Sequence, residues 1–252
     1  MRWLILLFVT WAAAAPAQSE SIVADLSQSR VSITTTFTGS EILVFGAIKR
    51  DAPVEVLDPP HVIVTVAGPS APVTVRKKDR IAGIWVNAAE AQIDSAPSFY
   101  AVSTTGPMAT VLSHTEDLRH SVSKNRAIRF VGAADDGDPA HFQEALIRIR
   151  EDAGAYALNE GEVAFFDDTL FRTSVGLPAN LVEGAYTVRI FLTRDRNVVS
   201  TYETTISVRK VGLERFLYNL AHDRPLIYGL MSLAIAIAAG WLASAAFQIM
   251  RR

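Results

Sequence analysis

The C-terminal end of the chain carries its most constraining feature, a run from Leu226 to Met250 without a charged side chain. About 20 apolar residues in an α-helix cross the hydrocarbon layer of a bilayer, so this run can span a membrane with some tilt. A helix that is apolar on all sides lies either in a membrane or in the core of a large protein. The chain has no other long helical pattern that could bury it. We therefore predict a membrane-spanning helix at 225–250, followed by a short tail at 251–252.

The N-terminal end has the pattern of a secretory signal peptide. Arg2 precedes an apolar run over residues 3–15, and Ala15-Pro16-Ala17 offers a cleavage site between small residues. We predict a signal peptide at 1–17, because the apolar run is too short to span a membrane comfortably as an uncleaved anchor. An export signal at one end and a span at the other predict that the region between them lies outside the cytoplasm and the C-terminus inside.

The composition excludes several classes of protein. The formal net charge is −2 and charged residues make up 20% of the chain, so no global basic field recruits nucleic acid. The chain contains no cysteine. Disulfides, thiolate zinc sites, iron–sulfur clusters and a cysteine nucleophile are therefore excluded.

Residues 18–116 form a first predicted β-sandwich block. Apolar and polar residues alternate from Val31 to Phe37, which is the period of a strand with one face on a core. A largely apolar run at 41–48 predicts a central strand. Shorter β-branched runs, separated by glycine and proline, predict further strands at 54–56, 61–66 and 72–76. Runs of this length and punctuation favour an antiparallel sandwich.

Residues 117–160 are predicted to be a helical connector. Asp138-Pro139 provides an N-cap followed by proline at the first helical position. Phe142, Leu146 and Ile149 then recur at helical spacing. We expect this amphipathic helix, near 139–153, to pack against the sheets.

Residues 161–211 form a second predicted β block, of immunoglobulin-like character. Alternating apolar residues from Tyr186 to Leu192 predict a long strand, which turns at 194–197 into a return strand. A glycine two residues before Tyr186 resembles the tyrosine corner of immunoglobulin-like sandwiches, so we expect Tyr186 to be buried with its hydroxyl bonded to nearby backbone. The predicted fold is thus mostly β, with antiparallel immunoglobulin-like sandwich unit(s), one packed helix and a C-terminal transmembrane helix. The pattern leaves open whether the two blocks build one sandwich or two.

Residues 212–224 form a patterned linker between the β region and the span. Its apolar residues follow helical spacing and its polar residues lie elsewhere on the turn; the apolar ones are Leu213, Phe216, Leu217 and Leu220. The pattern predicts a short amphipathic helix closed by Pro225, either at the membrane interface or packed under the β domain.

Several stretches of the chain resemble a family of alphaproteobacterial transmembrane proteins without an established activity: 37–46, 64–69, 177–180 with 183–186, and 212–218 followed by 225–229. These stretches have the character of structural signatures. The resemblance covers essentially the whole mature chain and implies a single-pass protein of the bacterial inner membrane with a periplasmic β domain. It also implies an association with a sulfite-exporter-like (TauE/SafE-type) permease.

A search for catalytic or metal-binding patterns gives weak candidates. There is no G-x-S-x-G, no Walker A motif and no H-E-x-x-H. His114 and His120 flank carboxylates, but their separation fits neither a helix face nor a strand face. Acidic residues at 135–138 and 167–168 are ordinary turn residues, although the first group could bind calcium. The basic run 76–80 is expected to be a solvated loop.

These observations favour a non-enzymatic, membrane-anchored accessory module without cofactor, metal or catalytic residues. The alternative is an anchored periplasmic ligand- or metal-binding protein or hydrolase. The partners expected are inner-membrane lipid and either an integral membrane protein or a second copy of the span. Small residues at i+4 spacing would form the packing face in the membrane; this small-residue face is Ser232, Ala236, Gly240 and Ser244, continued by Gln248.

Overall fold

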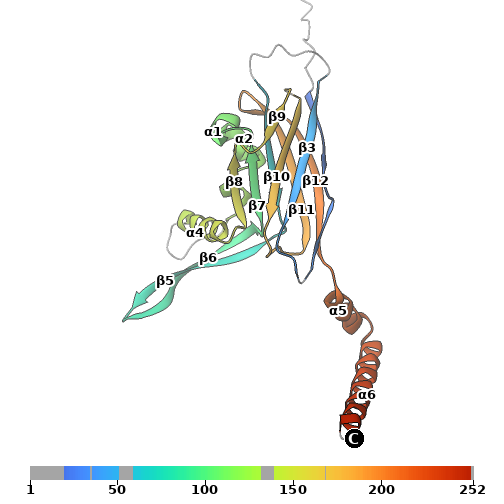
Figure 1. The fold of residues 1–252 in the computed structure, drawn as a ribbon. Coiled ribbons are helices and arrows are strands. Elements are labelled where there is room, and N and C mark those ends of the chain that lie inside the picture. The colour runs from blue at the N-terminus through green and yellow to red at the C-terminus, as the bar shows by residue number, and fades with distance from the viewer. Residues whose placement is uncertain (1–19, 35, 51–58, 132–138, 168, 251–252) are drawn as a thin grey trace, which may run out of the picture.

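A computed structural model describes residues 20–34, 36–50, 59–131, 139–167 and 169–250; for residues 213–215, 219 and 245–250 it describes the backbone. Figure 1 shows a β domain with helices on one side, a projecting two-stranded ribbon, and a helical tail at the C-terminus. The strands are β1 (Glu20–Leu26), β2 (Arg30–Ile33), β3 (Ser40–Arg50), β4 (His61–Ala67), β5 (Ser70–Ile81), β6 (Ile84–Pro97), β7 (Tyr100–Thr104), β8 (Tyr156–Glu160), β9 (Ala164–Phe166), β10 (Leu170–Leu177), β11 (Gly184–Arg194) and β12 (Asn197–Lys210). The helices are α1 (Met108–Val111), α2 (His114–His120), α3 (Lys124–Ala127), α4 (Pro139–Asp152), α5 (Leu213–Asp223) and α6 (Pro225–Met250).

Two sheets form the β domain. The smaller has the order β1-β3-β10-β9, and the larger has the order β2-β12-β11-β4-β7-β8. β3 pairs with β10 and β4 pairs with β11, so both sheets combine strands from before and after the helices. The two β blocks therefore build one pair of sheets. The mostly β, antiparallel fold is confirmed, while two edge pairs, β2 with β12 and β7 with β8, are parallel.

The first core lies between the two sheets. The alternation predicted for β11 places Tyr186, Val188, Ile190 and Leu192 on this side, each 0% exposed. They meet inward-facing residues of the smaller sheet, among them Ile42, Val44, Phe171 and Val175. Because side chains alternate across a strand, one apolar residue in two is enough to fill such a core.

The second core lies on the other face of the larger sheet, under the short helices. The sheet contributes Ile63, Tyr100 and Phe191, and the helical side contributes Val111, Phe142, Leu146 and Ile147. The predicted packed helix is confirmed as α4. Its buried face differs in one position: Ile149 is 55% exposed and Ile147 is buried instead. Phe191 is buried on the helical side of β11, because this strand is covered on both faces.

The β5–β6 ribbon leaves the larger sheet and projects from the end of the domain nearest α5 (Figure 1). Its base is held in the second core by Val75, Ala91 and Ile93. From residue 76 to residue 88 every side chain is exposed. The basic run 76–80 is therefore part of a strand, and the prediction of a loop there is wrong, because β5 continues to Ile81 by pairing with β6.

The tyrosine corner is present. Tyr186 is 0% exposed, and its hydroxyl donates to the Val182 carbonyl at 2.9 Å. Gly68 lies against it: a Cβ there would be 2.6 Å from Ser98 Oγ and 3.0 Å from Tyr186 Cε1. This local feature agrees with the sequence prediction, although the antiparallel sheets do not by themselves assign the sandwich to the immunoglobulin type.

Some of the other predictions are confirmed, one predicted strand is shorter in the structure, and the rest fall outside the described residues. The apolar run 41–48 is the interior strand β3; the turn predicted at 167–168 lies between the paired strands β9 and β10, and its second residue is outside the described residues. The alternation from 31 to 37 predicts more strand than forms, since β2 ends at Ile33. The signal peptide at 1–17, the strand at 54–56 and the acidic turn at 135–138 lie outside the described residues.

Candidate functional site

The C-terminal helix α6 is the membrane anchor predicted from the sequence. Residues Pro225–Ser244 are apolar and long enough to cross a bilayer, and none of this segment is buried inside the protein. Figure 1 shows α6 standing away from the β domain, with α5 between them. A long, uniformly apolar helix without a protein neighbour belongs in lipid.

The small-residue face of α6 is open wherever its side chains are described. Ser232, Ala236, Gly240 and Ser244 are exposed, whereas the side chain of Gln248 lies outside the description. A Cβ built on Gly240 would meet nothing within 4 Å apart from its own stretch of helix. The Ser232 hydroxyl donates to the Gly229 carbonyl at 2.9 Å and is thus satisfied within the helix. The face can therefore be approached closely by a second helix.

The amphipathic linker forms helix α5, as its spacing predicted. Phe216 is 58% exposed, while Leu217 and Leu220 are half-buried; the Leu213 side chain is not described. Only Arg224 separates α5 from Pro225, the first residue of α6. The helix is thus confirmed, and its position at a membrane interface stays a prediction.

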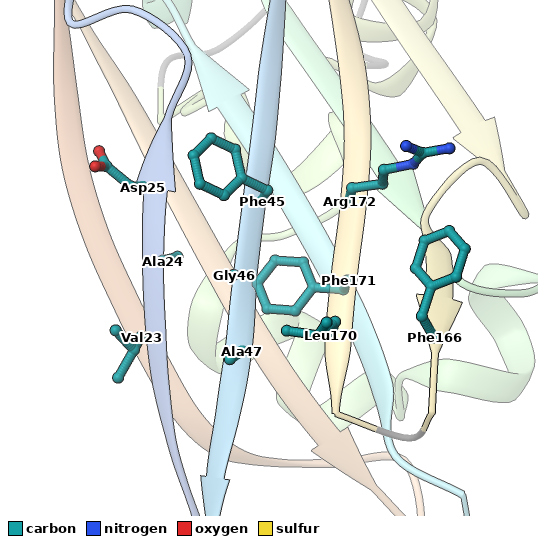
Figure 2. Close-up of a pocket in the computed structure, with 10 residues that line it drawn as sticks. All are labelled: Val23, Ala24, Asp25, Phe45, Gly46, Ala47, Phe166, Leu170, Phe171 and Arg172. Atoms are coloured by element: carbon teal, nitrogen blue, oxygen red, sulfur yellow. The ribbon is translucent and has the colours of Figure 1, made fainter.

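The outer face of the smaller sheet carries a set of exposed apolar side chains that we call the outer apolar face. Figure 2 shows them on neighbouring strands: Val23 on β1, Phe45 on β3, Leu170 on β10 and Phe166 on β9. They are 59%, 41%, 52% and 43% exposed. They line an open groove of about 720 Å³ together with Ala47, Asp25 and Arg172. Contiguous exposed apolar surface of this kind marks interaction sites on folded proteins.

The backbone beneath this groove explains its shape. Gly46 lies in β3 where a Cβ would be 2.6 Å from the Val23 carbonyl oxygen and 2.7 Å from Phe171 Cζ. Glycine there lets the Phe171 ring fill the core directly under the groove. The Arg172 guanidinium lies 5.1 Å from the centre of the Phe166 ring, so one rim of the groove is cationic.

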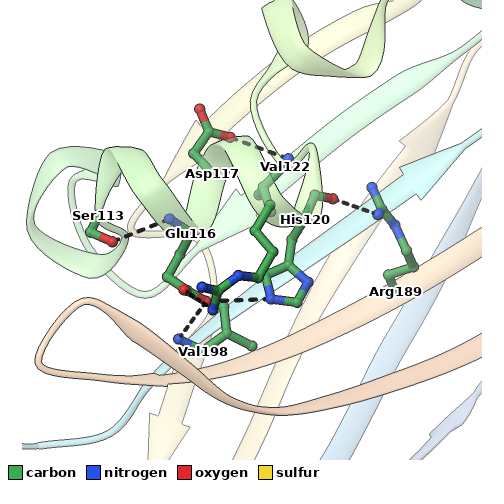
Figure 3. A network of polar contacts seen from close by, with 8 residues as sticks. Ser113, Glu116, Asp117, His120, Val122, Arg189 and Val198 are labelled. Carbon is green, nitrogen blue, oxygen red and sulfur yellow. Dashed lines mark hydrogen bonds and ion pairs between the residues drawn. The ribbon is translucent and has the colours of Figure 1, made fainter.

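The histidine and carboxylate group around α2 is a structural network (Figure 3). Ser113 caps the helix by accepting a hydrogen bond from the Glu116 N–H at 3.3 Å. The buried Glu116 carboxylate meets Arg119 Nη1 at 2.5 Å and His120 Nε2 at 3.3 Å. It also accepts a hydrogen bond from the Val198 N–H at 3.4 Å. These contacts fasten α2 to β12.

The C-terminal end of α2 is closed by two further side chains. Arg189, from the middle of β11, donates to the carbonyls of His120 at 2.8 Å and Ser121 at 3.1 Å. Asp117 accepts hydrogen bonds from the N–H groups of Val122 and Ser123. A cation at a helix C-terminus satisfies carbonyls that lack partners in the helix. The network thus docks the helix on the sheet.

His114 does not join this network as a ligand. It is exposed at the first turn of α2, and His120 is turned toward Glu116. Among the residues that the structure describes, no three His, Asp or Glu side chains are grouped as a metal site requires.

A second polar cluster ties the two sheets together at the end away from α5. Glu20 on β1 accepts from Arg194 Nε at 2.7 Å and from Arg194 Nη2 at 2.8 Å. It also accepts from Arg50 Nε on β3 at 3.1 Å. The hydrogen bond from Arg194 lowers the pKa of the Glu20 carboxyl, although its burial opposes this shift. The bidentate geometry fixes β1 against β11.

Two buried tyrosines have raised pKa values. Burial raises the pKa of Tyr100 and that of Tyr156 to about 12. Their hydroxyls donate to the carbonyls of Val122 and Pro97, each at 2.7 Å. They remain protonated at neutral pH and hold the helical layer and the ribbon base in place.

Comparison with known proteins decides the family. The family described as "Putative transmembrane protein (Alph_Pro_TM)" matches residues 21–249. The chain belongs to Alph_Pro_TM. The match runs from β1 into α6, so the Alph_Pro_TM family includes both the β domain and the span. No curated protein matches the chain.

The solved structures that match include a distantly similar one. It is Spo0M, a sporulation control protein from Bacillus subtilis, with 9% identity and a TM-score of 0.29. The similarity covers 81% of this chain and 55% of that one, so the chain spans about half the length of its structural match. A likeness this distant carries no argument about function.

Two of the exposed apolar surfaces were not predicted from the sequence. The outer apolar face had a signal, because the run at 41–48 is apolar at successive positions and a strand with one solvated face should alternate. The apolar end of the ribbon was indicated by Ile84-Trp85, which begins four positions after the end of the basic run 76–80. Two of the stretches that carry the family resemblance, 64–69 and 183–186, are structural, since they meet at the Tyr186 corner.

Proposed function

We propose that this protein is a non-enzymatic accessory module of the bacterial inner membrane. Its β domain lies in the periplasm, α6 crosses the bilayer once, and the C-terminus is cytoplasmic. It binds an integral membrane protein in the same bilayer, such as a transporter. The predicted signal peptide at 1–17 supports this orientation.

The observation that carries the proposal is the outer apolar face on a domain tied to a membrane. Val23 and Leu170 each expose more than half of their surface, and the neighbouring Phe45 and Phe166 expose two aromatic rings. Aromatic residues are enriched in the central part of protein interfaces. A groove lined by such side chains, with charge at Asp25 and Arg172, suits a protein segment with an apolar stretch and polar flanks.

The tether favours a partner in the same membrane. Anchoring confines the domain to the bilayer surface, which raises its effective concentration toward other membrane proteins. The open small-residue face of α6 supplies a second contact inside the lipid. Rows of small residues at i+4 spacing let helices cross closely, at an angle of about −40°. A partner that meets both surfaces needs a transmembrane helix and a periplasmic segment.

Photocrosslinking in native membranes tests this proposal. A photoreactive residue replaces Phe45 in one variant and Ala236 in a second. Leu158, which is 40% exposed on β8, and Leu242 on α6 provide the matched control positions. We expect Phe45 and Ala236 to capture the same integral membrane protein, identified by mass spectrometry, and the control positions to capture it several-fold less.

Substitution separates specific packing from simple anchoring. Gly240→Leu fills the small-residue face, whereas Leu242→Ala changes a neighbouring side of α6. We expect Gly240→Leu to reduce the crosslink from Ala236 and Leu242→Ala to preserve it. Equal crosslinking in both variants, or capture of soluble proteins alone from Phe45, contradicts the proposal. A product of twice the mass of this chain identifies a second copy as the partner in place of a transporter.

The orientation has its own test. A cytoplasmic reporter fused after Arg252 should be active, and an alkaline phosphatase fused there should be inactive. An active phosphatase at that position would overturn the periplasmic assignment.

A further inference from the structure

The end of the β5–β6 ribbon is unusually apolar for a segment that no other described part of the chain covers. Ile81 is 59% exposed, Ile84 69%, Trp85 66% and Val86 37%. The loop between the strands is Ala82-Gly83, with φ values of 52° and 86°. Two residues with positive φ form the tight turn that suits a twisted hairpin. We call residues 81–86 the ribbon tip.

The ribbon tip stands far from the core that holds its base. Val75 is the last buried residue of β5, and Ile81 lies six positions further along the strand. At about 3.3 Å per residue, the ribbon reaches roughly 20 Å beyond the domain. Figure 1 shows that it leaves the end of the β domain nearest the anchor and that its tip lies level with α5. A membrane surface drawn across the start of α6 passes close to it.

Strand register gives the tip two different faces. Ile81 pairs with Ile84, and Val86 follows on the same side of the ribbon. Arg80 pairs with Trp85 on the opposite side, next to Lys78. Arg80 Nε also donates to the Gly83 carbonyl at 3.2 Å, which holds the guanidinium beside the turn. Residues 76–80 comprise four basic side chains and one acidic side chain, so the stem behind the tip is cationic.

We propose that the ribbon tip is a second membrane contact, which inserts its isoleucines and Trp85 into the interfacial layer of the bilayer that holds α6. Tryptophan is enriched at membrane–water interfaces, where its ring lies at headgroup level. Basic residues next to an inserted apolar group attract anionic lipid headgroups. A lipid surface satisfies both faces of the tip together, because the isoleucines enter the interface from one face while Trp85, Arg80 and Lys78 on the other face lie at the level of the headgroups.

The position of the tip selects lipid over a soluble partner. The tip and the anchor lie at the same end of the domain (Figure 1), so a bilayer that surrounds α6 would face the tip. With α6 and the ribbon both attached, the β domain is held at two separated points and keeps a fixed tilt. This contact is independent of the proposed partner protein, and it is tested with the chain and lipid alone.

Tryptophan fluorescence of the full chain in lipid nanodiscs tests the contact. The chain has four tryptophans: Trp3, Trp11, Trp85 and Trp241. Replacing the other three by phenylalanine leaves Trp85 as the reporter. The nanodiscs contain phosphatidylglycerol and a lipid spin-labelled either near the headgroup or near the chain end. We expect the label near the headgroup to quench Trp85 at least twofold more than the label near the chain end.

The matched control moves the reporter to the opposite end of the domain. Val199 lies beside the β11–β12 turn and is 46% exposed. The variant Trp85→Phe with Val199→Trp should show no quenching by either label and full quenching by iodide in the buffer. Lipid quenching of Trp85 no stronger than that of the Val199→Trp reporter would overturn the proposal.

Two further outcomes identify what the tip contacts. Lys78→Gln with Arg80→Gln should halve the quenching of Trp85 in anionic nanodiscs and leave it unchanged in zwitterionic ones. Discs loaded with one chain or with two should give the same lipid quenching. If Trp85 is shielded from iodide only in discs with two chains, and is not quenched by lipid, the tip binds a second copy and the proposal fails.

Discussion

Two long hairpins of this protein have similar pairing and opposite surroundings. β11 and β12 are 11 and 14 residues long, and β5 and β6 are 12 and 14 residues long. In the first hairpin, β11 is covered by the smaller sheet on one face and by helices on the other. Its turn, Asp195-Arg196, is polar and lies away from the anchor. The second hairpin is bare beyond Val75, and its turn is flanked by Ile81 and Ile84 on the anchor side.

The difference shows that backbone pairing and burial are separate requirements. A two-stranded hairpin is marginally stable alone in water, so the ribbon depends on the base that Val75, Ala91 and Ile93 fix in the second core. Beyond that base, the choice of side chains is free of packing constraints. The apolar tip therefore contributes little to the stability of the domain and is available for an external contact.

The largest expected effect separates the two hairpins directly. Ile190 is 0% exposed on β11 and Ile84 is 69% exposed on β6. Ile190→Ala leaves a cavity between the sheets and should reduce the free energy of unfolding by about 2–5 kcal/mol. Ile84→Ala should change it by less than about 0.5 kcal/mol. Denaturant titration of the full chain in detergent measures both. Similar losses would mean that the ribbon tip is packed in solution.

The polar end of the β11–β12 hairpin gives an intermediate effect. Glu20→Gln removes the charge that Arg194 and Arg50 share and should cost about 2 kcal/mol. Because the folded-state pKa of Glu20 is lowered, its stabilisation is present above the unfolded-state pKa and is lost as pH falls through the folded-state value.

Melting temperatures measured from neutral to acidic pH test this contribution. The wild type should lose more stability than Glu20→Gln over the acidic range, so the two curves should converge. Curves that stay parallel would show that the ion pairs contribute nothing that depends on pH.

The smallest effect concerns the tyrosine corner where β11 begins. Tyr186→Phe removes the hydrogen bond to the Val182 carbonyl and should cost about 1 kcal/mol. That loss lowers the melting temperature by about 2–4 °C in a protein of this size. Tyr202→Phe is the control, since its hydroxyl bonds to no other described group. An unchanged melting temperature for Tyr186→Phe, or equal shifts in both variants, would show that the corner is not stabilising.

The sequence predicted the elements whose pattern depends on local physics. α6 follows from an uninterrupted apolar run, α4 from apolar residues at helical spacing, and β11 from alternation. It did not predict how β5 continues to Ile81, because a charged strand that pairs only with its neighbour lacks the alternation by which strands are found. Ile149 was misplaced because the direction from which the sheet covers α4 is a tertiary property.

The candidate sites likewise differ in whether they could be predicted from the sequence. The small-residue face could be predicted from spacing alone, because the i+4 spacing places these residues on one side of α6. The outer apolar face could not, because Phe45 and Phe166 are brought together by pairing β3 with β10 and β10 with β9. Residues far apart in sequence form one surface only after the sheet exists.

The pairing of strands that are distant in sequence also determines when the β domain can fold relative to the synthesis of the anchor. Glu20 and its partner Arg194 are 174 positions apart, and β2 lies beside β12. Loops of this length must close before the contacts stabilise anything, so the two sheets form late. β12 ends at Lys210 and the anchor starts at Pro225, so synthesis reaches the anchor almost as soon as the larger sheet is complete. We therefore expect the β domain to acquire its final structure while already attached to the membrane, and a chain cut short before β12 to expose unfinished apolar strands.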